Sequence, residues 1–222
     1  MNMSGTGESN TQEARNSMPR LIGPLVVMLA LALAFAGPAA AATPTETLKA
    51  YSDHVVKILD DPALKDRKGD RRAAVRKVAE EIFDLTETSK RALGPHWQQR
   101  TPAEREEFTQ LFSDVLESTY IARIDEYGGE RVRYVGEKLD GDLAIVQTRV
   151  VTRKGTEVPV DARMLKRGDK WYIYDVILEG VSLINNYRTQ FDRIIRTASY
   201  AELVKRLKDR KAMPAPQPRA ER

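Results

Sequence analysis

The chain has 222 residues, no cysteine, and 36 lysines and arginines against 32 acidic residues, which gives a net charge of +4. The basic excess lies in residues 205–222, whereas residues 43–204 are nearly neutral. This distribution argues against a nucleic-acid partner, because a nucleic-acid-binding face needs basic residues on the folded body. The lack of cysteine excludes disulfides, thiolate chemistry and cysteine-rich metal sites.

Residues 1–42 have the layout of a secretory signal peptide. A polar segment with two arginines precedes an uncharged apolar run at 21–35, and alanines follow. The run is shorter than the ~20 residues of a membrane-spanning helix. This length favours cleavage after Ala41 or Ala42 over an uncleaved membrane anchor. The mature protein is therefore expected to be exported and periplasmic.

Residues 43–211 are expected to form one domain, followed by a disordered, basic and proline-rich tail at 212–222. The first half of the domain has helical patterns. Apolar residues recur at helical spacing in segments 48–59 and 75–82, and a shorter third helix ends at the Gly-Pro pair 94–95.

The strongest helix signal begins at Thr101. Thr101 suits the N-cap, Pro102 the first turn, and Glu104 completes a capping box. The apolar stripe that follows predicts one long amphipathic helix; it consists of Phe108, Leu111, Phe112, Val115, Leu116 and Tyr120.

Four strand patterns come next, at 131–136, 143–152, 157–165 and 171–178. Short turns that contain glycine separate them, which favours an antiparallel meander. Apolar and polar residues alternate in the third strand, and the apolar positions are Val158, Val160, Ala162 and Met164. One face of the sheet is therefore expected to be buried and the other to face water.

Two predicted helices, 182–197 and 199–211, close the chain. Helices, then strands, then helices predict an α+β fold, with helices packed on one face of a curved four-stranded antiparallel sheet. Such a sheet often encloses an apolar pocket, as in NTF2-like and cystatin-like folds. The residues alone leave open whether this pocket is empty or filled by side chains.

The segment 171–191 changes from strand to helix. Gly180 marks the switch, and Ser182 can cap the helix that follows. A nucleophilic role for Ser182 is the alternative, but no glycine follows it at the spacing of a nucleophile elbow. This junction is expected to help to wall any internal chamber.

Signals for catalysis and metal binding are weak. His54 and His96 have no partner at metal-ligand spacing, and the sequence holds no glycine loop for phosphate. No catalytic residue, metal or cofactor is therefore expected.

Asp175 lies inside the fourth strand pattern. By alternation it is expected to share a face with Trp171, Ile173 and Ile177. The opposite face is then expected to carry Tyr172, Tyr174, Val176 and Leu178. If buried, Asp175 could act as a general base. The alternative is an ion pair with a cation of the neighbouring strand, such as Arg163.

Several pieces of the chain, in order, together resemble the MlaC family of periplasmic phospholipid-binding proteins, also called toluene-tolerance auxiliary proteins. The pieces are LGPHW at 93–97, TPAEREEF at 101–108, WYIYD at 171–175, EGVSL at 179–183 and NYRTQF at 186–191. Phe112 and Tyr120 fit the same pattern. The resemblance spans essentially the whole expected mature chain.

The resemblance implies a soluble periplasmic carrier that binds phospholipid as its cargo and needs no cofactor. Members of the family exchange lipid with an inner-membrane ABC transporter that has an MCE-domain subunit and with an outer-membrane lipoprotein complex. This transport maintains the lipid asymmetry of the outer membrane. The alternatives are an acid–base enzyme that uses Asp175 with a tyrosine, and a scaffold that binds only other proteins.

The resemblance and the strand alternation together give an expected lipid pocket between sheet and helices. Its expected lining is Phe112, Leu116, Tyr120, Val146, Val150, Val160, Met164, Tyr174, Val176, Val181, Tyr187 and Phe191. Arg188 is expected near the pocket mouth, where it meets the lipid headgroup or forms an ion pair on its own helix.

Overall fold

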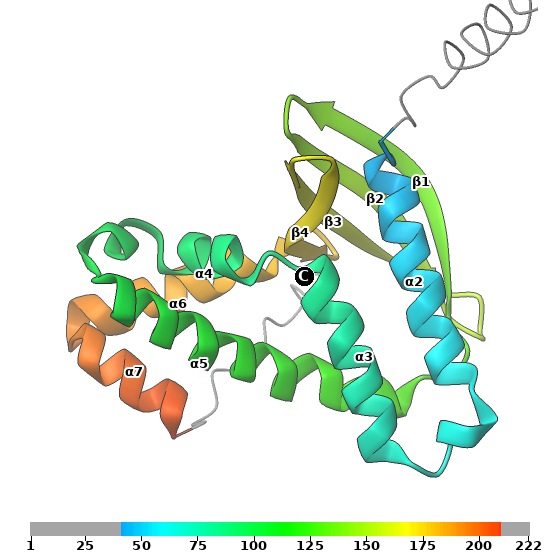
Figure 1. Ribbon diagram of the computed structural model, residues 1–222, viewed down its shortest axis with the longest axis horizontal. Helices are drawn as coiled ribbons and strands as arrows, with labels where there is room; N and C mark the ends of the chain where they lie inside the picture. Colours follow the sequence, from blue (N-terminus) through cyan, green and yellow to red (C-terminus); the bar gives the residue numbers. More distant parts are fainter. Residues whose placement is uncertain (1–40, 210–222) are drawn as a thin grey trace, which may run out of the picture. The chain divides into compact units, whose positions relative to one another are not determined.

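The computed structural model describes residues 41–209, except for the side chains of Ala122 and Arg123 (Figure 1). Nearly all of the predicted signal peptide, 1–42, and the whole predicted tail, 212–222, lie outside this range. Those predictions are therefore untested. Within the described range, no helix combines the length and the apolarity that crossing a membrane requires.

Helices fill the first half of the described chain, as the sequence predicts. They are α2 (Pro44–Asp60), η2 (Pro62–Leu64), α3 (Lys68–Ile82), α4 (Leu85–Leu93), η3 (Gly94–Gln99), α5 (Pro102–Tyr120) and η4 (Ile121–Glu126). The capping box that was predicted for α5 is present, because Thr101 and Glu104 each accept a hydrogen bond from the other's backbone N–H. The same device starts α2, at Thr43 and Glu46.

The second half holds the sheet and two closing helices. Their bounds are β1 (Arg131–Asp140), β2 (Leu143–Val151), β3 (Glu157–Arg167), β4 (Lys170–Leu178), β5 (Val181–Ser182), α6 (Leu183–Thr197) and α7 (Tyr200–Lys208). The strands lie in the order β1-β2-β3-β4-β5, and each pairs antiparallel with the next. The α+β class and the antiparallel meander are thus confirmed.

The sheet has a fifth strand that the sequence analysis did not predict. β5 is two residues long and pairs with the end of β4 through Ile177–Ser182 and Leu178–Val181. The turn between them consists of Glu179 (φ 49°) and Gly180 (φ 80°). A tight hairpin turn of this kind requires positive φ at both positions. A glutamate in this conformation is uncommon, so the hairpin was not predictable from these two residues.

β1 continues to Asp140, although the sequence pattern predicted that the strand ends at Gly136. The pairing with β2 shifts by one residue between Tyr134 and Gly136. A Cβ atom at Gly136 would lie 2.8 Å from the side-chain oxygen of Gln147. The glycine therefore allows close packing at an irregularity inside the strand and does not end it.

A second irregularity, in β4, overturns the predicted faces of that strand. Arg163 pairs with Asp175 and Met164 pairs with Ile173, which leaves Tyr174 as an extra residue. Such a bulge places residues on either side of it out of simple alternation. The prediction that Asp175 shares a face with Trp171 and Ile173 is therefore wrong, whereas Ile177, which pairs with Asp161, does share the face of Asp175.

The bulge also separates Val176 from Tyr174. Val176 packs against the same buried cluster as Ile173, whereas Tyr174 lines a cleft with Asp175. The predicted common face of Tyr174 and Val176 is thus also wrong, for the same reason.

Two apolar clusters hold the described residues together. The helix cluster joins α4, η3, α5, α6 and α7; its buried members are Ala92, Leu93, Trp97, Phe108, Phe112, Val115, Ile184, Tyr187, Phe191, Leu203 and Leu207. The sheet cluster lies on one face of the sheet; its buried members are Ile82, Ala144, Val146, Ala162, Met164, Trp171 and Ile173.

Helices α2 and α3 cover the sheet cluster. Leu48 and Tyr51 of α2 pack against it, and Ile82 at the end of α3 belongs to it. The start of α2 is fixed to β1, because the backbone N–H and the hydroxyl of Thr45 both donate to Glu137 Oε2, at 2.8 and 2.6 Å. Figure 1 shows α2 lying along β1 and β2, with α4, α5, α6 and α7 gathered beyond β4.

Candidate functional site

A polar cleft of about 860 Å³ lies where β3 and β4 meet α4 and the start of α6. Most of its lining side chains are polar or charged, so it is not the apolar pocket that the sequence predicts. The lining consists of Arg91, Arg163, Tyr174, Asp175, Gly180, Val181, Ser182, Ile184, Asn185, Asn186, Arg188, Thr189 and Gln190.

Asp175 forms the floor of this cleft and is only 3% exposed. Its Oδ2 accepts from the Ser182 hydroxyl at 2.6 Å and from Arg163 Nη1 at 3.1 Å. Its Oδ1 accepts from the backbone N–H of Ile184 at 3.1 Å. The carboxylate thus joins β3, β5 and the first turn of α6, which is a structural task. The predicted ion pair between Asp175 and Arg163 is confirmed.

Ser182 is the N-cap of α6, as predicted. Its Oγ accepts a hydrogen bond from the backbone N–H of Asn185 at 3.0 Å, and its hydroxyl donates a hydrogen bond to Asp175 Oδ2. Both functions of the hydroxyl are therefore used in fixing the start of the helix.

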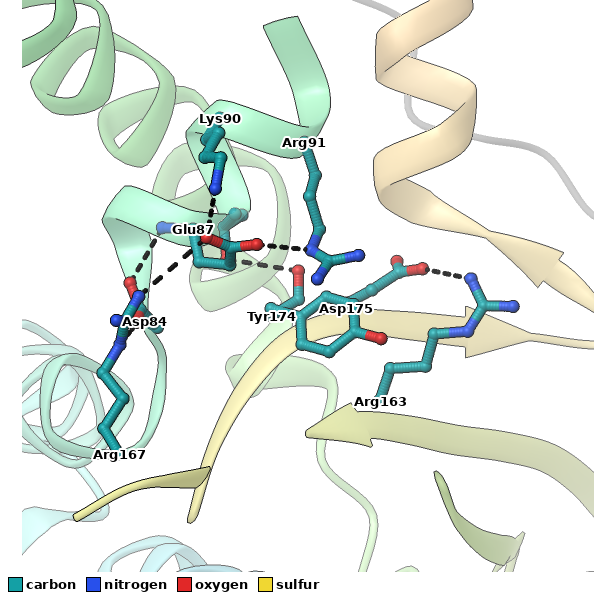
Figure 2. A network of polar contacts seen from close by, with 9 residues as sticks. Asp84, Glu87, Lys90, Arg91, Arg163, Arg167, Tyr174 and Asp175 are labelled. Atoms are coloured by element: carbon teal, nitrogen blue, oxygen red, sulfur yellow. Dashed lines mark hydrogen bonds and ion pairs between the residues drawn. The ribbon is translucent and has the colours of Figure 1, made fainter. Parts of the chain in front are cut away.

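Arg91 of α4 forms one wall of the cleft. Its guanidinium carbon lies 3.9 Å from the centroid of the Tyr174 ring, a cation–π contact. Its Nε donates to Glu87 Oε1 at 2.9 Å, and the hydroxyl of Thr88 donates to the Tyr174 carbonyl at 3.2 Å. Figure 2 shows Arg91 and Arg163 on either side of the pair formed by Tyr174 and Asp175.

The carboxylates behind Arg91 are shared with other cations. Arg167 of β3 donates to Asp84, the N-cap of α4, and lies 3.9 Å from Glu87. Lys90 Nζ lies 3.4 Å from Glu87 (Figure 2). Because the charge of Glu87 is divided among several cations, it neutralises Arg91 only partly.

Arg188 of α6 also lines the cleft. It donates to the side-chain oxygen of Asn185, and its methylene groups pass over Gly94. A Cβ atom at Gly94 would lie 3.1 Å from Cδ of Arg188, and the φ of Gly94 is 57°. Glycine at this position therefore ends α4 and leaves room for the arginine.

The two histidines are placed apart from the cleft. His96 Nε2 lies 2.9 Å from Asp192 Oδ1 and links η3 to α6, while His54 is exposed on α2. Across residues 41–209 there is no group of three or more histidine, aspartate or glutamate side chains placed to hold a metal ion.

Comparison with known proteins identifies the family. A family model described as "MlaC protein" matches residues 49–209. The chain belongs to the MlaC family. The resemblance seen in the sequence is confirmed.

Two similar proteins illustrate the match. The intermembrane phospholipid transport system binding protein MlaC of Haemophilus influenzae is 21% identical over 148 residues, which cover 64% of this chain and 69% of that protein. The solved structure of a phospholipid-binding protein from Ralstonia solanacearum, in complex with a phospholipid, is similar to this chain with a TM-score of 0.67 at 25% identity. The match covers 76% of this chain and 97% of that one.

The structure divides the residues that were expected to line an MlaC-type pocket among several places. Phe112, Tyr187 and Phe191 are fully buried in the helix cluster, with Leu116 and Tyr120 against it. The sheet cluster holds Val146, Met164 and Val176, whereas the cleft holds Tyr174, Val181 and Arg188. Val150 and Val160 are half-buried on β2 and β3. Their contact with lipid stays a prediction.

Arg91 was not predicted as a residue of the cleft. The spacing of Glu87 and Arg91 indicates an ion pair on one helix face. It does not say what that face meets, because the contact with Tyr174 depends on the bulge in β4.

Proposed function

We propose that this protein is a periplasmic phospholipid carrier that moves lipid between an inner-membrane ABC transporter with an MCE-domain subunit and an outer-membrane lipoprotein complex. Such transport would maintain the lipid asymmetry of the outer membrane. The observation that carries the proposal is membership of the MlaC family across residues 49–209, together with a similar fold that binds phospholipid in the Ralstonia solanacearum protein.

The sheet offers a surface on which acyl chains can lie. Beyond the sheet cluster, the same face continues through residues that remain half-buried; these are Val150, Val158, Val160 and Leu178. Val150 pairs with Val158, and Val160 pairs with Leu178, so the four side chains form one continuous strip. Half-buried residues on α2, such as Val55 and Leu59, extend the apolar surface.

Burial of acyl chains on this strip supplies the energy for taking a lipid out of a bilayer. Each buried methylene group is worth about 0.8 kcal/mol, so a carrier has to cover most of both chains to compete with the membrane. We assign the acyl chains to the space between this strip and the helices that cover the sheet.

Mass spectrometry of chloroform extracts from the purified protein tests the cargo. Phospholipid is expected in the extract in a fixed ratio to protein after gentle preparation. Repeated recovery of protein without phospholipid would contradict the proposal.

A charged substitution on the strip locates the chains. Val150→Glu places a carboxylate where apolar contact is needed, so the co-purified phospholipid should fall at least several-fold. The matched control is Val135→Glu, since Val135 is 44% exposed on β1. Equal losses in both variants, or none in Val150→Glu, would place the cargo elsewhere.

Transfer of a labelled phospholipid between two vesicle populations tests the carrier step. The purified protein should accelerate transfer in proportion to its concentration. Reconstituted inner-membrane and outer-membrane complexes then test whether either partner raises the rate further.

A further inference from the structure

We propose that the polar cleft binds a phosphate-type anion through Arg91, Arg163 and Arg188. These arginines come from α4, β3 and α6, three elements that are distant in the sequence. Their shared position around one cleft of about 860 Å³ is therefore a product of the fold.

The first argument is charge. Asp175 is the sole carboxylate among the residues that line the cleft, against the three arginines. Asp175 is itself occupied by Arg163, the Ser182 hydroxyl and a backbone N–H. The cleft therefore keeps a net positive charge, which attracts an anion.

The second argument is the number of hydrogen-bond donors that remain. Arg91 uses its Nε for Glu87, Arg163 uses Nη1 for Asp175, and Arg188 uses Nη2 for Asn185. A guanidinium group has five N–H donors in a planar fork. Each arginine therefore keeps donors that suit the oxygens of a phosphate, which arginine binds in a bidentate manner.

The third argument is that the three side chains are held in place. Arg91 is stacked on Tyr174, Arg163 is bonded to Asp175, and Arg188 lies across Gly94. Side chains that are already ordered lose little conformational entropy when they bind a ligand.

The volume and the lining limit the kind of ligand. The volume falls within the range of about 300–1,000 Å³ that is typical of small-molecule sites. Polar groups of α6, such as Asn186 and Gln190, line much of it. The cleft thus suits a hydrated group such as glycerol phosphate or a lipid headgroup, and does not suit acyl chains.

The phosphate has two possible sources. One is the headgroup of the bound phospholipid, and this source rests on the proposed function. The other is a phosphate from outside the protein. Arg163 and Asp175 lie on the face of the sheet opposite to Ala162 and Val176, which belong to or contact the sheet cluster. An external phosphate can therefore reach the cleft without entering the apolar space. The cargo headgroup reaches it around the β5 edge of the sheet, where Leu178 of the strip pairs with Val181 of the cleft.

Isothermal titration calorimetry with glycerol 3-phosphate tests the site in two preparations, the protein as purified and the protein after removal of lipid. We expect saturable binding to the lipid-free protein. Arg91→Gln and Arg188→Gln should each weaken it by at least about tenfold, because each removes charge-assisted hydrogen bonds. Arg193→Gln, an exposed arginine of α6 outside the cleft, is the matched control and should bind as the unchanged protein does.

The two preparations separate the sources. If glycerol 3-phosphate binds only to the lipid-free protein, the cargo headgroup occupies the cleft in the protein as purified. Equal binding to both preparations shows an external phosphate. Failure of both preparations to bind, unchanged binding in Arg188→Gln, or an equal loss in Arg193→Gln would overturn the proposal. If the chloroform extracts contain no phospholipid, the carrier function is contradicted. The titration would still test whether the cleft binds phosphate.

Discussion

The helix cluster and the sheet cluster differ in how completely they are filled. In the helix cluster, the Phe112 ring lies 5.1 Å from the rings of both Tyr187 and Phe191, and all three residues are 0% exposed. The sheet cluster is mostly aliphatic, and half-buried valines such as Val150 and Val160 continue its face of the sheet. One cluster is closed by its own aromatic side chains, and the other leaves apolar surface to be covered.

The difference fits the proposal that acyl chains lie on the valine strip, while the closed helix cluster serves stability. Interlocked aromatic rings leave no room for a ligand, whereas a partly covered valine strip gains energy from any apolar group laid against it. Ion pairs between α3 and the α5–η4 segment connect the two regions, since Arg76 bonds Glu117 and Arg71 bonds Asp125.

The largest expected effect lies in the helix cluster. Phe112→Ala should lower the free energy of unfolding by about 3–5 kcal/mol, because it opens a cavity among packed rings. Urea denaturation measures this change, and lipid extraction measures the cargo per folded protein. A large loss of cargo at unchanged stability would reverse the assignment and make Phe112 a lipid contact, as the sequence predicted.

The next effect concerns the polar joint between the two regions. Asp175→Asn should lower the free energy of unfolding by about 1–3 kcal/mol, because the amide is a weaker acceptor for the hydrogen bonds from Ser182, Ile184 and Arg163. Co-purified phospholipid should remain largely intact in the folded fraction. Loss of cargo without loss of stability would instead give Asp175 a direct part in binding.

A pair of identical substitutions tests the sheet itself. Val146 is 0% exposed, so Val146→Ala should lower the free energy of unfolding by about 2 kcal/mol. Val160 is half-buried, so Val160→Ala should lower it by about 1 kcal/mol. The effect on cargo should run the other way, with Val160→Ala reducing co-purified phospholipid more than Val146→Ala. Parallel effects on stability and cargo would remove the distinction between filled and open parts of this face.

The smallest effect is a pH dependence at the connection between the regions. Arg71 Nη2 lies 2.8 Å from Asp125 Oδ1 and holds the pKa of that carboxyl below its usual value, and Arg72 lowers the pKa further. Because the pKa is lower in the folded protein than in the unfolded chain, this pair stabilises the fold above about pH 3.9. The stabilisation is lost as the pH falls through the pKa of the folded protein.

Urea midpoints at pH 6 and pH 3 measure this dependence. Asp125→Asn should show a smaller fall between the two values than the unchanged protein, with the exposed Asp66→Asn as control. Identical falls in all three proteins would show that Asp125 makes no contribution.

Features that depend on neighbouring residues in the sequence were predictable. Thr101 and Glu104 marked the start of α5, Ser182 marked the start of α6, and the patterns of β2, β3 and β4 gave their bounds to within two residues. Hydrogen bonds between residues three apart and side-chain alternation are local, so a single sequence carries them.

Features that depend on a partner strand or helix were not predictable. The extra residue at Tyr174 is defined only by the pairing of β4 with β3, and it moved Asp175 to the other face. Arg91 lines the cleft because it stacks on Tyr174, and this contact joins a helix to a strand that is distant in the sequence. The ion pair of Arg163 and Asp175 was predicted as one alternative. The two residues lie on strands that were expected to be neighbours, and opposite charges on neighbouring strands pair favourably.

The extra residue in β4 also determines where this strand can change its length during evolution. Removal of Tyr174 would leave Ile173 opposite Met164 and Asp175 opposite Arg163, so every other side chain of the strand would keep its side. Removal of a residue elsewhere in β4 would turn part of the strand over and bring charge into the apolar space. Position 174 is therefore the point at which a one-residue gap in an alignment leaves the pairing of the sheet intact, and what is lost is the ring beneath Arg91 and the carbonyl that accepts from Thr88.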